Sequence, residues 1–572
     1  MNPLSEAKKE ILDILNRVAP GAGFDARELS APPDPALGDL AINCFALAKK
    51  RGENPAITAK DLAEAINKIF AVRPGFFAQA EAKGPYLNFS FNYPRLAATI
   101  LREIARKKKS YGAAKPRSKS RVLLEYANPN THKDIHVGHL RNFFLGHAFV
   151  KLLRAMGAQV VPVSYINDLG AHVAKCVWAM EKFASKERPA VGERIEFMGR
   201  LYSRAVKIEE ENPEAKKEIS AIHRELEAGG GTHLPFYRLT RNWSLAELKA
   251  VFKELGLEIK KYYFESELIP ETRRIIEEYK KRGIVKQSQS AWIVDLENQG
   301  LGVNLLVKSD GTLLYNAKDL ALAQKKEKDF HPEASLYVVD TRQTLALRQL
   351  FATLLAAGFG KKLIHVPYEF VTLREGAMSS RSGRIIRYQD FRDEMIAKAT
   401  VETAKRHPDW SKKKISQTAR AIAFGAMVVG MLKQDNDRKI VFDMEEALSF
   451  DGFTGPYFQY TSARLKSILR KAGRKKIALP ANAELCLAER RLVADLASYP
   501  EVLEVAAKSY RPAKLVSFLF ETAKHFAEFY EAVPVLKAPG SERARRIALV
   551  AALSEVFSGA FEILGIPQIS EM

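Results

Sequence analysis

Hydrophobic and polar positions follow two different periods along the first hundred residues. Apolar residues recur at helical spacing over Pro3 to Val18, and the segment 36–50 starts a second helical pattern. A third helix is expected over 54–70, with Thr58 as its N-cap. Residues 84–92 alternate with a period of two, which predicts a strand. Helices and a strand together indicate an α+β domain at the N-terminus.

The pattern then changes to strands alternating with helices. A strand, a loop and a helix start are expected over 122–142, and a second strand over 159–168. This alternation favours a parallel, doubly wound sheet, which binds ligands at the carboxyl ends of its strands. The loop and the Asn167–Asp168 pair both fall at that edge. The charged, helical segment 185–300 resembles an insertion, after which the alternation resumes over 291–375.

Beyond residue 390 the pattern is almost entirely helical. We therefore predict a multidomain α/β protein with a Rossmann-like parallel-sheet core, an inserted domain, an N-terminal α+β domain and a C-terminal all-α bundle. The expected boundaries are 1–110 for the N-terminal domain, 118–390 for the core with its insertion at about 185–300, 391–445 for a helical connector and 446–572 for the bundle.

The net charge of the chain favours a polyanionic partner. The 572 residues include 89 basic and 67 acidic ones, which gives a net charge of +22. Such an excess steers polyanions toward a protein and makes binding of nucleic acid depend on salt, although it also serves solubility.

Cysteines and apolar runs indicate the compartment. Cys44, Cys176 and Cys486 are far apart, so neither a disulfide framework nor a zinc site is expected. The N-terminus contains acids at amphipathic spacing and resembles neither a signal nor a transit peptide. The longest apolar run, Ala421–Leu432, is too short to span a bilayer. We expect a cytoplasmic protein with no membrane partner and no metal site of its own.

The loop from Glu125 to Asn142 has the composition of an anion site. His136, Gly138 and His139 stand at the expected helix start, with Lys133 just before them. Helix-start amides, imidazoles and an ammonium group would converge there, and the glycine would let a flat ligand approach the backbone. Two histidines at this spacing are, however, more often structural.

A second loop supports the interpretation of the first loop as an anion site. Residues 377–383 read Ala-Met-Ser-Ser-Arg-Ser-Gly, so Ser379, Ser380 and Arg381 could clamp a pyrophosphate. Serine-rich turns are common, and this loop alone would carry little weight. Its meaning comes from its order along the chain, after a basic N-terminal domain and the histidine loop and before a helical region.

Taken together, the two loops resemble the HIGH and KMSKS signatures of class I aminoacyl-tRNA synthetases. The match is closest to arginyl-tRNA synthetases and covers nearly the whole chain. It includes EYANPNTHKDIHVGHLRN, YINDLG, LVKSDGTLLYNAKDLALA, YVVDTRQTLALRQLF, EGAMSSRSG, TGPYFQYTSARL, FYEAVPVL and LGIPQISEM.

The resemblance implies an arginine–tRNA ligase. Such an enzyme forms arginyl-adenylate from L-arginine and ATP, with Mg²⁺ carried by the nucleotide, and activation itself requires tRNA. It then transfers the arginyl group to the 2′-hydroxyl of the terminal adenosine of tRNA(Arg). The expected partners are tRNA(Arg), L-arginine and ATP, and the expected state is a monomer. Adenylate formation depends on positioning and charge neutralisation.

The resemblance also assigns roles to individual residues. Catalysis falls to Lys133, His136, His139 and Arg381. ATP binding is assigned to His136, Gly138, His139, Met378, Ser379 and Ser380. Arginine binding is assigned to Asp319, which would pair with the guanidinium, to Tyr315 and Gln343, which would orient it, and to Glu125 and Asn130, which would hold the amino and carboxylate end. Binding of tRNA is assigned to Tyr86 and Asn88 for the D-loop and to Tyr457, Tyr460, Arg464, Tyr530 and Met572 for the anticodon.

The second loop departs from the signature in one informative way. The first lysine of KMSKS is Ala377 here, and the second is Arg381. Arginyl enzymes that lack the usual lysine resemble this chain in having one just before HIGH, and Lys133 matches that position. We therefore expect Lys133 to supply the charge at the α-phosphate.

Two other readings compete with this one. A cysteinyl-like or other class I ligase would keep the fold, but the cysteinyl type needs a zinc site for which no cysteines are spaced. A catalytically silent paralogue that only binds RNA is favoured by Ala377 alone. Intact His136, His139 and Asp319 argue against it.

Overall fold

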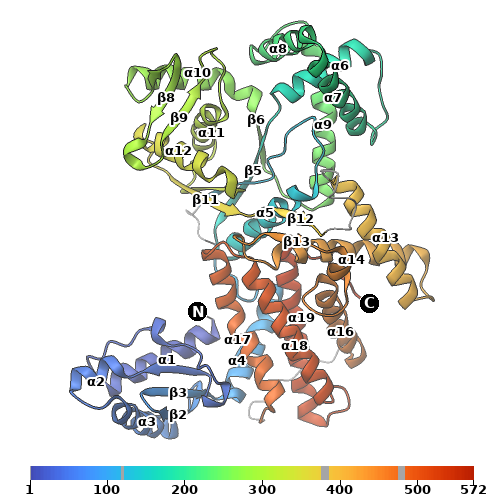
Figure 1. The fold of residues 1–572 in the computed structure, drawn as a ribbon. Coiled ribbons are helices and arrows are strands. Elements are labelled where there is room, and N and C mark those ends of the chain that lie inside the picture. The colour runs from blue at the N-terminus through green and yellow to red at the C-terminus, as the bar shows by residue number, and fades with distance from the viewer. Residues whose placement is uncertain (1, 117–120, 375–385, 474–483) are drawn as a thin grey trace.

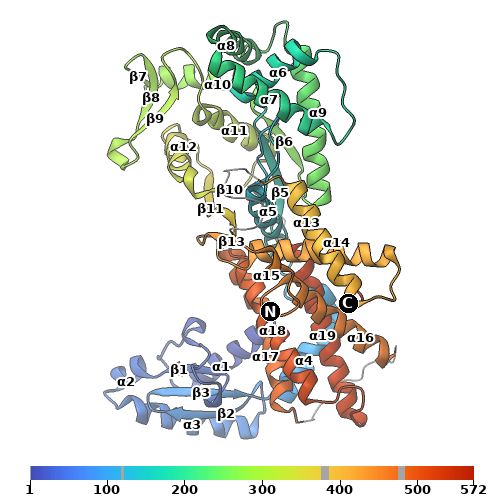
Figure 2. The same ribbon diagram turned by 45° about the vertical axis from the view of Figure 1, so that its right-hand side comes forward.

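The computed structural model of the chain describes residues 2–116, 121–374, 386–473 and 484–572. A parallel sheet lies in the middle of an elongated molecule, between inserted helices at one end and long C-terminal helices at the other (Figure 1). The N-terminal domain lies beside the C-terminal helices, and both views show it far from the inserted helices (Figure 2). The multidomain α/β fold predicted from the sequence is confirmed.

The N-terminal domain packs helices on a three-stranded antiparallel sheet of order β1-β3-β2. Its elements are α1 (Pro3–Val18), β1 (Leu40–Asn43), α2 (Phe45–Arg51), α3 (Pro55–Val72), β2 (Phe77–Lys83), β3 (Tyr86–Phe91) and α4 (Tyr93–Lys107). The predicted first helix and the predicted strand are both present.

Two predictions for this domain were wrong. The segment 36–50 was expected to start a helix, but residues Leu40–Asn43 pair with β3 before α2 begins. The N-cap of α3 is Asn54, whose side chain accepts from the Ala56 amide, whereas Thr58 lies buried inside the helix. Asn followed by Pro is a strong helix start, because proline at the first position lacks the amide that would stay unpaired.

The core sheet has five parallel strands in the order β11-β10-β4-β5-β6. The strands are β4 (Arg121–Glu125), β5 (Gln159–Ile166), β6 (Lys261–Phe264), β10 (Ala334–Asp340) and β11 (Lys362–Tyr368). Four of these strands, β4, β5, β6 and β10, are followed by the helices α5 (Val137–Ala155), α6 (Ala171–Ala184), α10 (Glu265–Lys281) and α12 (Thr344–Ala356), respectively. Helix α11 (Tyr315–Phe330) follows β9 (Val303–Val307) and precedes β10. Because β4 is central, the loop after it lies in the middle of the carboxyl edge.

The segment expected to be inserted contains part of this sheet. Three helices, α7 (Arg194–Glu211), α8 (Pro213–Glu227) and α9 (Leu234–Glu254), do interrupt the strand order. However, β6 lies within the predicted range and pairs with β5. The strand-like stretches near 291–307 belong to a separate antiparallel sheet of β7 (Lys286–Ser288), β8 (Ala291–Asp295) and β9 (Val303–Val307). Strand patterns identify strands but not the sheet that they join.

Helices form nearly all of the C-terminal third. They are α13 (Tyr388–Arg406), α14 (Lys412–Leu432), α15 (Met444–Leu448), α16 (Gly455–Ala472), α17 (Leu487–Lys508), α18 (Ala513–Ala532) and α19 (Gly540–Leu564). Two short strands, β12 (Val371–Leu373) and β13 (Ile440–Phe442), pair in parallel and join this region to the core.

Two of these helices, α14 and α19, are long and apolar enough to cross a membrane. In their most apolar windows, 67% and 72% of the residues are buried within the protein. Their apolar side chains therefore form the core on which α5, α16 and α17 pack.

Candidate active site

The histidine loop ends in an unusual helix cap. His136 is the N-cap of α5, and its Nδ1 accepts from the Gly138 amide at 3.1 Å. The His139 Nδ1 accepts in turn from the His136 amide, also at 3.1 Å. Both rings thus use Nδ1 as an acceptor, so each carries its proton on Nε2. The cap leaves two Nε2–H donors side by side, with ring centroids 3.9 Å apart.

Both histidines are neutral donors. Burial lowers the pKa of His136, and nearby Lys133 lowers it further. Burial lowers the pKa of His139 to about 3, with a further contribution from His136. Hydrogen bonds at this site therefore do not switch off as the pH rises through neutrality.

Gly138 makes this cap possible. A Cβ atom at this position would lie 2.9 Å from the ring of His136. We expected the glycine to leave room for a ligand, and the structure adds a second reason. Without a side chain at residue 138, the His136 ring can fold back onto its own helix.

The neighbouring His132 anchors the loop. It is buried, with φ at +58°, and its amide donates to the Ser244 hydroxyl of α9 at 3.0 Å. Its Nε2 lies 2.9 Å from the Thr240 hydroxyl of the same helix. The adjacent Lys133 is exposed, and it forms no ion pair with any residue in the described ranges. A fixed loop therefore presents a lysine ammonium next to the two imidazoles.

A cluster of charges lies at the other end of the loop. Glu125, the last residue of β4, is buried and pairs with the buried Lys326 of α11. Glu265, the first residue of α10, is buried and pairs with Lys318. Asp319 is half-buried beside them and forms no ion pair within the described parts of the chain. Burial and the Glu125 carboxylate raise the pKa of Asp319 to about 7.

The remaining residues predicted to bind arginine surround this cluster. Tyr315 begins α11, one turn before Asp319, and its side chain is 55% exposed. Asn130 forms a β-bridge with Asn167 at the end of β5. Gln343 is exposed at the end of a 3₁₀ turn that follows β10. All of these residues therefore lie at or near the carboxyl edge of the sheet.

Sequence reasoning missed several polar groups at this edge. They are Tyr165, His172, Glu265, Lys318 and Lys326. Tyr165 Oη, Asn167 Oδ1 and His172 Nε2 are buried without a hydrogen-bond partner among the described residues. Buried polar atoms are normally paired, so each of these three atoms is available to a polar ligand. The sequence analysis pointed to this region only through the Asn167–Asp168 pair at the end of β5.

Asp168 has a structural role at the same edge. Its carboxylate accepts from Tyr237 at 3.1 Å, from Arg241 at 2.6 Å and from the amide and hydroxyl of Ser266 at 2.9 and 2.8 Å. This residue fastens α9 and α10 to the end of β5, and all of its oxygen atoms are occupied.

The serine loop lies outside the described residues. Ala377, Met378, Ser379, Ser380 and Arg381 all belong to it. The chain just after it is paired with the histidine loop. The Val137 amide donates to the Ile386 carbonyl at 3.2 Å, and the Tyr388 amide donates to the Ile135 carbonyl at 2.7 Å.

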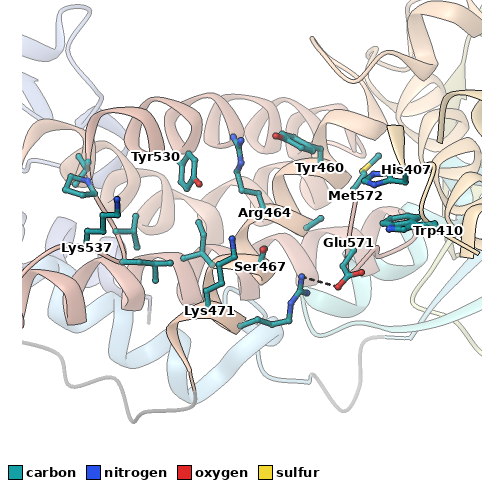
Figure 3. A pocket seen from close by; sticks show the side chains of 17 residues that line it. His407, Trp410, Tyr460, Arg464, Ser467, Lys471, Tyr530, Lys537, Glu571 and Met572 are labelled. Carbon is teal, nitrogen blue, oxygen red and sulfur yellow. Dashed lines mark ion pairs between the residues drawn. The ribbon is translucent and has the colours of Figure 1, made fainter. Parts of the chain in front are cut away.

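A second candidate site is a groove in the C-terminal region. It has a volume of about 630 Å³ and brings together Tyr460, Arg464, Tyr530 and Met572 from the predicted set (Figure 3). The Arg464 guanidinium lies between two rings, 5.0 Å from the centroid of Tyr460 and 4.5 Å from that of Tyr530. Cations and aromatic faces in one groove suit unstacked bases.

The groove also includes residues that were not predicted, and it leaves one predicted residue out. Tyr457 is half-buried against Phe520 and does not line the groove. His407 and Trp410, from the turn between α13 and α14, do line it, with stacked rings 3.9 Å apart. Lys471 also faces the groove (Figure 3).

The two residues predicted in the N-terminal domain differ in exposure. Tyr86 is 49% exposed and makes an edge-to-face contact with Phe45, which is also exposed. Asn88 is buried, and its side-chain amide lies 3.5 Å from the Glu81 carbonyl. The predicted strand therefore offers one of the two side chains to a partner.

The sheet and the histidine loop at its central strand define the class of the protein. A family model described as the catalytic domain of class I (R) tRNA synthetases matches residues 100–444. Models of an arginyl-tRNA synthetase N-terminal domain and of the DALR anticodon-binding domain match residues 5–91 and 458–572.

Relatives agree with these matches over the full chain. The arginine–tRNA ligase of Bdellovibrio bacteriovorus is 36% identical over 96% of this chain and 94% of its own length. The arginine–tRNA ligase of Halothermothrix orenii is 30% identical over 98% of both chains. The arginyl-tRNA synthetase structure from Thermus thermophilus superposes with a TM-score of 0.80 at 26% identity, over 99% of this chain and 100% of its own. The chain belongs to the arginyl-tRNA synthetase family.

Proposed function

We propose that this arginine–tRNA ligase activates L-arginine with ATP at the carboxyl edge of its five-stranded sheet. One observation supports this site above the others. The loop after β4 starts at Glu125 in the charge cluster and ends at the paired histidines, so one short segment reaches both places. Adenylate formation needs the arginine carboxylate and the ATP α-phosphate side by side, which such a loop provides.

ATP would lie over the start of α5. In this proposal the Nε2–H groups of His136 and His139 donate to phosphate or ribose oxygens, and the exposed Lys133 ammonium neutralises the α-phosphate. The serine loop, with Met378, Ser379, Ser380 and Arg381, closes on the pyrophosphate. Mg²⁺ arrives with the nucleotide, and within the described ranges no group of three His, Cys, Asp or Glu residues is arranged to hold a metal ion.

Arginine would lie over the start of α11. Asp319 pairs with the guanidinium, and Tyr315 and Gln343 orient it. Glu125 and Asn130 hold the amino and carboxylate end. The cluster supports this orientation, because Asp319 is half-buried and has no ion pair with a described residue, as the acceptor of an incoming cation must be.

The rest of the chain would bind tRNA(Arg). The C-terminal groove holds anticodon bases against Tyr460, Arg464, Tyr530 and Met572, with Tyr457 behind them. The N-terminal domain contacts the D-loop through Tyr86, with Asn88 below it. We further propose that activation requires tRNA, and that the arginyl group passes to the 2′-hydroxyl of the terminal adenosine. The domain limits are those predicted above, except that the insertion ends before β6, and the enzyme acts as a monomer in the cytoplasm.

The test is ATP–pyrophosphate exchange with a panel of amino acids, with and without tRNA. We expect exchange with arginine only, and only when tRNA(Arg) is present. Exchange with another amino acid would contradict the specificity, and arginine-dependent exchange without tRNA would contradict the tRNA requirement.

A further inference from the structure

Two buried lysines stand among the acids of the arginine site, although its substrate is itself a cation. We infer that Lys318 and Lys326 are specificity-determining residues, internal counter-ions that occupy Glu265 and Glu125 and leave Asp319 as the acid that an incoming guanidinium neutralises. This inference rests on the proposed function of the site.

The geometry of each lysine carries the argument. The Lys326 side chain is 1% exposed, and its ammonium pairs with Glu125 while lying 4.2 Å from the ring centroid of Tyr337. Tyr337 is paired directly with Glu125 across β10 and β4. This lysine is enclosed below the site and cannot turn toward solvent. A cation so enclosed has a fixed partner and acts as part of the pocket.

Lys318 is buried and paired in a similar way, next to Glu265 at the start of α10. Its side chain is 6% exposed, and its ammonium pairs with Glu265 and lies 3.7 Å from a carboxylate oxygen of Glu227. It also lies 5.7 Å from the ring centroid of Tyr315. The two lysines therefore reach the cluster from different levels of α11, because residues 318 and 326 lie more than two helical turns apart on this helix.

The pairing of charges explains why the site would favour a cationic side chain over a neutral one. Lys326 lies within ion-pair distance of Glu125, and Lys318 within ion-pair distance of Glu265 and Glu227, so Asp319 is the acid of this cluster without a cation among the described residues. A guanidinium supplies that missing cation. A neutral side chain of similar shape would leave Asp319 unpaired, which is costly in a partly buried site.

Removing either lysine charge would place a second unpaired acid in the pocket. Whichever carboxyl group then takes up the proton, arginine must displace that proton before it can bind. The charged groups that face Asp319 are Glu125 from β4, Glu265 from α10, and Lys318 and Lys326 from its own helix. The titratable phenols of Tyr165 from β5 and Tyr337 from β10 also lie near it. Loss of a cation therefore moves the pH dependence of arginine binding upward.

The experiment measures the KM for arginine between pH 6 and 8.5 in tRNA-saturated pyrophosphate exchange, with wild type, Lys326→Met, Lys318→Met and Lys326→Arg. We expect Lys326→Met to move the midpoint up by about one pH unit. Its KM at pH 7 would be about fivefold above wild type and would converge with it at pH 8.5. Lys318→Met should shift the midpoint in the same direction, and Lys326→Arg should keep the wild-type profile.

The matched control is Lys328→Met, on the exposed face of the same helix, which should not change the profile. A Lys326→Met profile that superimposes on wild type, or equal shifts in Lys326→Met and Lys326→Arg, would overturn the inference. If Lys326→Met does not fold, Lys318→Met tests the same charge balance. Wild-type exchange without arginine specificity would refute the proposed function instead, so the two failures are distinguishable.

Discussion

Lys133 is the residue whose proposed role depends most on its surroundings. It is exposed and lies beside two neutral imidazoles. Its loop is held in place by the hydrogen bonds of His132 to α9. A point charge held in place without a protein partner is available to a phosphate. The neutral histidines supply hydrogen bonds but no charge, so the ammonium has no substitute within the described part of the loop.

We predict that Lys133→Ala lowers the rate of arginine-dependent pyrophosphate exchange by about 100-fold or more, as for loss of one preorganised donor to developing charge. The KM for arginine should change little, because Asp319 lies at the other end of the loop. Lys133→Arg, which keeps the charge, is the control and should retain part of the rate. Unchanged exchange in Lys133→Ala would show that the charge comes from elsewhere.

Asp319 gives the site a dependence on pH. Its pKa is raised to about 7 by burial and by Glu125, so it is largely protonated below that pH and ionised above it. A neutral acid cannot pair with a guanidinium. We predict that the KM for arginine rises about tenfold for each pH unit below 7 and is flat above pH 8.

Two comparisons identify the group that titrates. Asp319→Asn should raise the KM for arginine and abolish its pH dependence, while the KM for ATP stays near the wild-type value. The pKa of His139 is lowered to about 3, so this signature histidine cannot produce a transition near pH 7. Persistence of the transition in Asp319→Asn would assign it to another group.

The sequence predicts some of these residues and not others, for a physical reason. Glu125, Lys133 and Asp319 stand within recognisable motifs or at the end of a predicted strand. Lys326 lies seven residues after Asp319 in a run of lysines and acids that is typical of a solvated helix face. Lys326 is buried by contacts far apart in sequence, with Tyr337 of β10 and Glu125 of β4. Burial of one lysine among several is a tertiary property that local pattern does not carry.

Helix α9 shows how one element supports the site. Successive turns contact different parts of the catalytic centre: Thr240 and Ser244 hold His132, and Arg241 holds Asp168. At its far end, Glu254 accepts from Tyr388, Arg392 and Arg420 of the helices that follow the serine loop. The helix therefore fixes the histidine loop relative to α13 and α14.

Loss of one of these contacts should be measurable. In Thr240→Val the buried Nε2 of His132 loses its hydrogen-bond partner, so we predict that the free energy of unfolding falls by about 1–3 kcal/mol. Chemical denaturation followed by circular dichroism would measure it. Asn242→Ala, on the exposed face of α9, is the control and should change stability less. Equal stability of Thr240→Val and wild type would mean that His132 finds another partner.

At the scale of elements, local pattern predicted most helices and the strands that flank the site. It failed where pairing is decided at long range. β1 is short and precedes a helix directly, so its apolar residues continue the helical pattern of α2. β6 has four residues after a long helical insertion and is recognisable only by its place beside β5. Such strands are defined by their neighbours and not by their own sequence.

The whole molecule connects the two candidate sites through α5. The helix that starts at His136 packs along its length on α14, α17 and α19. The buried Arg141 of α5 donates to the carbonyls of Glu369, Asp435 and Arg438, and Arg511 of the C-terminal bundle pairs with the Asp435 carboxylate. The bundle proposed to bind tRNA is thus in direct contact with the helix that carries the two histidines, and the proposed tRNA-dependent activation would act through this contact.

The distribution of charge separates the two substrates by their response to salt. The chain has an excess of 22 positive charges, and the cations that line the C-terminal groove include Arg464 and Lys471. Binding there releases counter-ions from phosphates, so affinity falls steeply with salt. The proposed pairing of arginine with Asp319 would take place at a half-buried side chain, where screening is weaker.

We therefore predict that the KM for tRNA rises at least about tenfold between roughly 50 and 200 mM KCl. The KM for arginine, measured at saturating tRNA in each salt, should change by less than about twofold. Steady-state aminoacylation at both concentrations gives the two constants from one preparation. A tRNA KM that does not depend on salt would mean that base contacts, and not the basic surface, provide most of the binding energy. Equal sensitivity of both constants would place the arginine site in open solvent, which the burial of Glu125, Glu265 and Lys326 contradicts.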